Sequence, residues 1–162
     1  WFYDYLPETR GLADAGDKIT ELEGHIPDIQ KLNPSTVFLC YGINDVGIGI
    51  WPTPEDYVAD FSRIIGEIQK AVPEAKIYLS SILPARDPAF ESNPDWRNIP
   101  QYNLALDKMC QEIDGCYFVN CDQLVEQYAD YYEVDGIHFQ YYFYPHWAAT
   151  LITEVYSSQL DW

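Results

Sequence analysis

Two short motifs in this chain combine residue types that perform acid–base and oxyanion chemistry. Asp135 stands three residues before His138, a spacing at which a carboxylate can hold an imidazole ring in one tautomer. Asn44 follows an apolar run and provides an amide N–H pair. A base, a group that orients it and donors for a developing oxyanion are the three requirements of ester hydrolysis by a serine.

A glycine in the sequence Ala15-Gly16-Asp17 is a further candidate oxyanion donor. Because Gly16 has no side chain, its backbone N–H can approach a substrate closely. Each motif also has a simpler structural interpretation: Gly16 and Asn44 can serve only in turns, and Asp45 is expected to brace its loop. An isolated Asp-x-x-His is more often a cap or a hydrogen-bonded loop. The combination of both motifs in one chain favours the catalytic interpretation.

The elements that must position these residues alternate between strands and helices. We expect strands at 10–13, 36–41, 75–82 and 117–119, a long loop at 83–97, and helices at 18–24, 53–72, 104–113 and 145–156, with a helical turn at 124–125. Asp17 is predicted to cap the helix at 18–24, and Pro27 to begin a separate helical turn. This alternation predicts a mostly parallel sheet covered by helices on both faces.

In such a fold the ligand crevice lies beyond the carboxyl ends of the strands. The segment Gly42-Ile43-Asn44-Asp45, read as a loop, directly follows a predicted strand. The Asp135–His138 motif stands on another loop, ahead of the last predicted helix. We therefore expect both motifs at the same edge of the sheet.

These residues resemble the conserved blocks of the SGNH (GDSL-type) hydrolases. Residues 12–17 are similar to the second block, Gly42 and Asn44 to the third, and Asp135 and His138 to the fifth. Around Tyr102-Asn103 the chain also looks like the family helix whose asparagine is structural. The resemblance spans nearly the whole chain from Leu12 onward.

The resemblance implies an α/β fold, a three-layer α/β/α sandwich with a mostly parallel, flavodoxin-like sheet. It implies carboxylic-ester hydrolysis through an acyl-serine intermediate. His138 is then the general base and acid, and Asp135 is its orienting partner. Gly16 and Asn44 are the oxyanion donors. No metal or organic cofactor is implied.

The first block of the family, a strand followed by Gly-Asp-Ser, does not occur in this chain. Ser80 and Ser81 fall at the end of a predicted strand without the sharp turn that a nucleophile needs. We expect the nucleophilic serine and the central strand to lie upstream of Trp1, so that residues 1–162 form a single SGNH-hydrolase-like domain without that block. The alternatives are a non-catalytic binding module that has lost its serine, and a flavin or nucleotide binder, disfavoured by the absence of a glycine-rich phosphate loop.

Composition limits the partners. The 162 residues fit one domain, and the net charge of −17 argues against nucleic acid. No apolar run approaches the roughly 20 residues of a membrane span. A metal site built from Asp45, Asp135 and His138 is a weaker alternative because it lacks a second histidine nearby.

The substrate is expected to be a small molecule or a carbohydrate ester, with a short acyl group such as acetyl. Trp51 and Trp96 fall in loops near the predicted crevice, where an indole can stack on a sugar ring or simply pack the loop. Cys110, Cys116 and Cys121 lack the paired spacing of a zinc site. One disulfide among these three cysteines is possible, and the spacing does not select the pair.

Overall fold

A parallel sheet forms the centre of the computed structural model, which describes residues 10–12 and 14–158. In this part of the chain the sheet has three strands, β1 (Thr36–Leu39), β2 (Lys76–Ser80) and β3 (Cys116–Val119), in the order β1-β2-β3. Both neighbouring pairs are parallel. The strand expected at 10–13 is not formed by residues 10–12, and position 13 lies outside the described residues.

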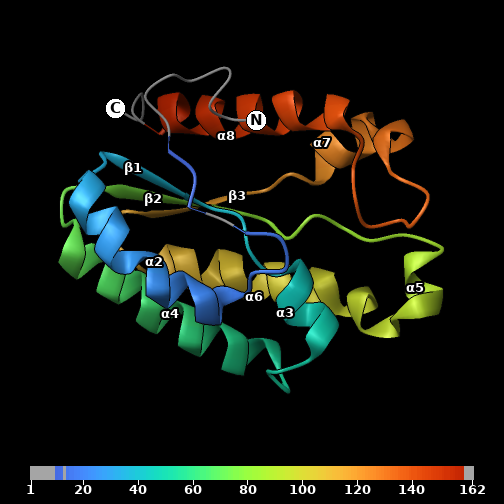
Figure 1. Cartoon of the computed structure of the whole chain (residues 1–162), viewed down its shortest axis with the longest axis horizontal. Helices are drawn as coiled ribbons and strands as arrows, with labels where there is room; N and C mark the ends of the chain where they lie inside the picture. The colour runs from blue at the N-terminus through green and yellow to red at the C-terminus, as the bar shows by residue number, and fades with distance from the viewer. Residues whose placement is uncertain (1–9, 13, 159–162) are drawn as a thin grey trace.

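Helices cover both faces of the sheet. They are α2 (Ile19–Leu32), α3 (Ile43–Ile48), α4 (Pro54–Ala71), α5 (Ala89–Ser92), α6 (Ile99–Glu112), α7 (Asp122–Gln127) and α8 (Tyr144–Ser157), with short 3-10 turns η1 (Pro94–Asn98), η2 (Ala129–Tyr131) and η3 (Tyr141–Phe143). Figure 1 shows α8 on one side of the sheet and α2, α4 and α6 on the other. This arrangement confirms the predicted three-layer α/β/α sandwich. Within the described ranges, no helix has the length and apolarity that crossing a membrane requires.

The hydrophobic residues of the strands form two cores, one on each face of the sheet. Val37 and Leu39 of β1 and Leu79 of β2 join the large core that also contains the buried residues of α2, α4 and α6. Tyr78 points to the opposite face and packs in a second core with Leu151 of α8. Successive side chains of a strand point to opposite faces, so each strand contributes to both cores.

Helix α4 follows its sequence signals closely. The Thr53 hydroxyl accepts a hydrogen bond from the Asp56 backbone N–H at 3.1 Å, and Pro54 occupies the first helical position. Phe61 and Ile68 face inward and are fully buried. This helix confirms the predicted boundaries of 53–72 because its cap and its apolar period agree.

The beginning of the chain differs from the prediction. Residues 19–32 form one helix, α2, with Pro27 inside it. The N-cap is Lys18 rather than Asp17, and the Glu21 carboxylate accepts the Lys18 backbone N–H at 2.9 Å. A proline inside a helix removes one backbone hydrogen bond. The helix continues because its buried face, which includes Leu22 and Ile29, packs in the core.

The carboxyl ends of the strands lead to α3, α5 and α7 (Figure 1). The segment predicted as a long loop contains α5 and most of η1. Asn103 of α6 fixes the chain after β2: its Oδ1 accepts the Ile82 N–H at 2.8 Å, and its Nδ2 donates to the Ile82 carbonyl at 2.9 Å. These two hydrogen bonds are consistent with the structural role that the family resemblance implies for Asn103.

Candidate active site

Asp135 and His138 are directly paired. Asp135 Oδ2 lies 2.6 Å from His138 Nδ1, and Asp135 Oδ1 accepts the backbone N–H groups of Ile137 and His138 at 2.9 and 3.0 Å. Burial raises the pKa of Asp135, but the hydrogen bonds from His138 and Ile137 outweigh it and lower the pKa to about 2. The carboxylate therefore stays ionised at neutral pH and fixes the ring by Nδ1, so that Nε2 is directed away from it.

The turn that carries this pair depends on Gly136. Its φ is +75°, and a Cβ at this position would lie 2.5 Å from the Arg86 carbonyl oxygen. The Arg86 backbone N–H donates to the Gly136 carbonyl at 3.0 Å, and Glu133 N–H donates to the His138 carbonyl at 2.8 Å. The Asp-Gly-Ile-His turn is thus held against the chain that follows β2. The His138 side chain itself is 72% exposed, so the imidazole is accessible from solvent.

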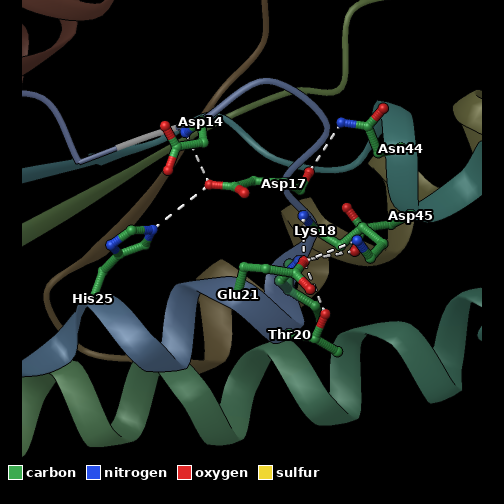
Figure 2. Close-up of polar contacts among 9 residues, drawn as sticks. Asp14, Asp17, Lys18, Thr20, Glu21, His25, Asn44 and Asp45 are labelled. Atoms are coloured by element: carbon green, nitrogen blue, oxygen red, sulfur yellow. Dashed lines mark hydrogen bonds and ion pairs between the residues drawn. The ribbon is translucent and has the colours of Figure 1, made fainter.

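Asn44 lies in the first turn of α3 and not in a loop as predicted. Gly42 makes this possible: its φ is +126°, and a Cβ there would lie 2.3 Å from an Ile82 side-chain carbon. The helix can therefore begin almost immediately after β1. Asn44 Nδ2 donates to the Asp17 carbonyl at 3.0 Å (Figure 2). Since an amide carries two N–H groups, this bond leaves a second one for another acceptor.

The bond from Asn44 sets its amide beside the turn that contains Gly16. Asp17 N–H donates to the Asp14 carbonyl at 3.3 Å, and the Asp17 carboxylate accepts the Asp14 N–H at 3.0 Å. Gly16 has a φ of +91°, is exposed, and would meet no atom within 4 Å of an added Cβ. Figure 2 shows Asp14, Asp17 and Asn44 together. The two expected oxyanion donors are thus carried by neighbouring segments.

Asp45 connects the same segments from below the surface. It is 2% exposed, and its Oδ1 accepts the backbone N–H of Ile19, the first residue of α2, at 3.0 Å. Its Oδ2 has no hydrogen-bond partner among the residues that the structure describes. Burial raises the pKa of Asp45 to about 6, against the lowering effect of the bond from Ile19. The bracing role expected for Asp45 is consistent with this contact.

Replacing Asp45 with asparagine is expected to change how stability depends on pH. The folded pKa of about 6 exceeds the 3.8 of an ordinary, solvent-exposed aspartate, so the native protein binds the proton more tightly and loses stability as the pH rises between these values. Relative to the parent, the free energy of unfolding of Asp45→Asn should therefore rise by up to about 3 kcal/mol between pH 4 and pH 7. Urea unfolding at several pH values measures this difference. Asp28→Asn, on the exposed side of α2, is the control for removing a charge. If the free energy of unfolding depends on pH in the same way for Asp45→Asn and the parent, the prediction is contradicted.

The segment after β2 contacts both groups of candidate residues. Arg86 holds the turn at Gly136, as described above. Farther along, Trp96 Nε1 donates to the Ile43 carbonyl at 2.9 Å, and Asn93 Nδ2 donates to the Gly47 carbonyl at 2.6 Å. Residues 86–96 thus contact both the turn that carries the Asp–His pair and the helix that carries Asn44. The sequence did not indicate this bridge, because both of its contacts are far away along the chain.

Trp51 and Trp96, the two candidate substrate contacts, lie in different surroundings. Trp51 is 7% exposed, its Nε1 donates to Asp60 Oδ2 at 2.8 Å, and its ring meets Tyr57 edge to face. This place in the core favours packing over substrate contact for Trp51. Trp96 is half-buried, and its indole N–H donates to the Ile43 carbonyl of α3.

A family model decides the relationship: the GDSL-like Lipase/Acylhydrolase family matches residues 4–144. The chain belongs to this family. The predicted family resemblance is thereby confirmed. Membership places the chain among ester-hydrolysing proteins at the level of the family. No curated protein sequence matches the chain.

Solved structures of GDSL-like and related esterases have the same fold as this GDSL-like chain. A GDSL-like lipase from Bacteroides thetaiotaomicron is 21% identical with a TM-score of 0.75, over 98% of this chain and 80% of that one. A family 3 carbohydrate esterase from Clostridium thermocellum is 21% identical with a TM-score of 0.71, over 93% and 70%. A carbohydrate esterase of family 3 from Talaromyces cellulolyticus is 18% identical with a TM-score of 0.69, over 91% and 70%.

The serines of this GDSL-like chain do not complete the site. All seven lie within residues 14–158, and none of them hydrogen-bonds to His138. Ser80 and Ser81 are 1% exposed. Ser80 Oγ accepts from Trp147 Nε1, and Ser81 Oγ accepts from the Cys121 backbone, both at 3.0 Å. In the same part of the chain, no three His, Cys, Asp or Glu side chains are grouped as metal ligands.

Proposed function

We propose that this GDSL-like chain is the main part of a serine-dependent carboxylic-ester hydrolase, one hydrolase domain whose nucleophilic serine lies in the block upstream of Trp1. The observation that carries the proposal is the Asp135–His138 pair, with 2.6 Å between Oδ2 and Nδ1. A carboxylate held ionised beside an imidazole has the geometry of a general base with its orienting partner. The Asn44 amide, which lies beside the Gly16 turn through its bond to the Asp17 carbonyl, supports it.

The proposed reaction has two steps. His138 Nε2 accepts the serine proton as the serine oxygen attacks the ester carbonyl, and His138 then returns the proton to the departing alcohol. Water hydrolyses the acyl-serine with the same base. Asp135 stays ionised throughout and stabilises the imidazolium. The second Nδ2 hydrogen of Asn44 and the backbone N–H of Gly16 donate to the oxyanion, joined by the N–H of the nucleophile.

The proposed substrates are esters of carbohydrates with small acyl groups. Among the solved structures of this fold are family 3 carbohydrate esterases and an acetyl xylan esterase. A net charge of −17 favours neutral over anionic substrates. Acetylated neutral sugars are carbohydrate esters with a small acyl group and carry no negative charge.

The alternative is a non-catalytic binding module with the same fold. It is favoured by one observation: none of the described serines is a hydrogen-bond partner of His138. In that case the upstream block carries no nucleophile, and the protein binds carbohydrate without hydrolysing it.

Fluorophosphonate labelling of the intact protein distinguishes the two. The label should appear on a serine upstream of Trp1, located by mass spectrometry, and should be lost in His138→Ala. Folded protein that takes no label would overturn the proposed hydrolase in favour of the binding module. Label that persists in His138→Ala would overturn the proposed role of His138 as the base that activates the serine.

A further inference from the structure

Two of the four cysteines lie close together, where helix α6 passes into strand β3. Cys110 is in the last turn of α6 and Cys116 is the first residue of β3. Their Sγ atoms are 3.3 Å apart. Both side chains are buried, with exposures of 4% and 6%. The turn between them is held by hydrogen bonds from Ile113 N–H to the Cys110 carbonyl and from Cys116 N–H to the Ile113 carbonyl.

The other two cysteines have different surroundings. Cys121 Sγ lies 3.6 Å from Ser80 Oγ and 3.7 Å from the Val119 carbonyl oxygen, in the core on the α8 side of the sheet. Cys40 follows β1 at the opposite edge of the sheet from β3. Neither is in hydrogen-bond contact with the Cys110–Cys116 pair.

We propose that Cys110 and Cys116 are a disulfide-forming pair, which closes the turn between α6 and β3 under oxidising conditions. An S–S bond is about 2.05 Å long, so the sulfurs need to approach by only about 1 Å. A rotation of the two side chains and a small adjustment of the turn at 111–115 supply this movement. The sequence left three pairings open among Cys110, Cys116 and Cys121, and the structure selects one of them.

The chemistry needs an oxidant, for which a small-molecule disulfide is sufficient. The thiolate of Cys116 attacks one sulfur of that disulfide and releases one thiol, giving a mixed disulfide on Cys116. The Cys110 thiolate then attacks Cys116 Sγ and releases the second thiol. Two protein thiols and one disulfide thus become one protein disulfide and two thiols. In the folded protein the hydrogen bond between the pair lowers the pKa of Cys116 and raises that of Cys110. The step balances equally with Cys110 as the first nucleophile.

The experiment is peptide mapping of the intact protein after refolding in a buffer of oxidised and reduced glutathione. Refolding gives the buried sulfurs access to the oxidant. Free thiols are alkylated, and the protein is cut by a glutamate-specific protease and by chymotrypsin. Cleavage after Glu112 separates Cys110 from Cys116, and cleavage after Tyr117 separates Cys116 from Cys121.

The expected product is a two-chain peptide joined through Cys110 and Cys116, lighter by two hydrogen atoms than its reduced parts and separated by a reductant. Cys121 should form no disulfide with either of them. Reduction should lower the melting temperature by roughly 5 °C. In the control Cys121→Ser the same linked peptide and melting shift should remain, whereas Cys116→Ser should lose both. Free Cys110 and Cys116 in refolded protein, or a link from either to Cys121, would overturn the proposal. It does not depend on the proposed hydrolase activity.

Discussion

Replacing His138 with alanine in the intact protein is expected to lower kcat for ester hydrolysis by roughly four to six orders of magnitude. Among the described residues, no other histidine is paired with Asp135. The variant therefore lacks both the group that accepts the serine proton and the group that donates it to the alcohol. Initial rates with a nitrophenyl acetate and with an acetylated sugar measure the loss. Circular dichroism checks that the fold is kept.

His146→Ala is the matched control for this experiment. His146 lies in the first turn of α8 and stacks on Tyr128, with ring centroids 4.0 Å apart. Removing it deletes an imidazole without touching the Asp–His pair, and kcat should stay within a few-fold of the parent. Equal losses in the two variants would refute the role of His138 as the base.

Replacing Asn44 with alanine is expected to lower kcat by roughly 10²–10³-fold, the typical effect of removing one oxyanion donor. The amide interacts with charge that develops only in the transition state, so kcat and kcat/KM should fall together while KM changes little. Steady-state kinetics of the intact protein measure both parameters.

A control is needed because Asn44 also holds the Gly16 turn through the Asp17 carbonyl. Asp17→Ala removes the carboxylate that accepts the Asp14 N–H and so loosens the same turn, but it keeps the Asn44 amide. Its kcat should fall much less than that of Asn44→Ala. Similar losses in both variants would assign the Asn44 effect to the turn and not to the oxyanion.

The features that could be predicted from the sequence are those with local signals. Helix α4 has its cap, its proline and its apolar period within one short segment, and three of the expected strands are apolar runs bounded by polar turns. The pairing of Asp135 with His138 also depends only on a spacing of three residues. The family resemblance added the order of these parts, which neither motif supplies alone.

The features that escaped prediction depend on packing between distant segments. Pro27 is tolerated inside α2 because the apolar face of that helix is buried. Trp51 lies in a loop as predicted, but it is buried because it contacts Asp60 and Tyr57 of the following helix. The burial of Asp45 likewise results from a contact with Ile19, 26 residues away. Composition and periodicity contain no information on such contacts.

The close approach of Gly47 to Trp96 restricts which pairs of residues homologous chains can have at these two positions. A Cβ at position 47 would lie 2.7 Å from Trp96 Nε1, so a larger residue there would displace the indole from its hydrogen bond to Ile43. The two positions should therefore covary in an alignment of homologues. Chains that keep tryptophan at position 96 should keep glycine at 47, and chains with a larger residue at 47 should have a smaller side chain at 96, although the two positions are 49 residues apart in the sequence.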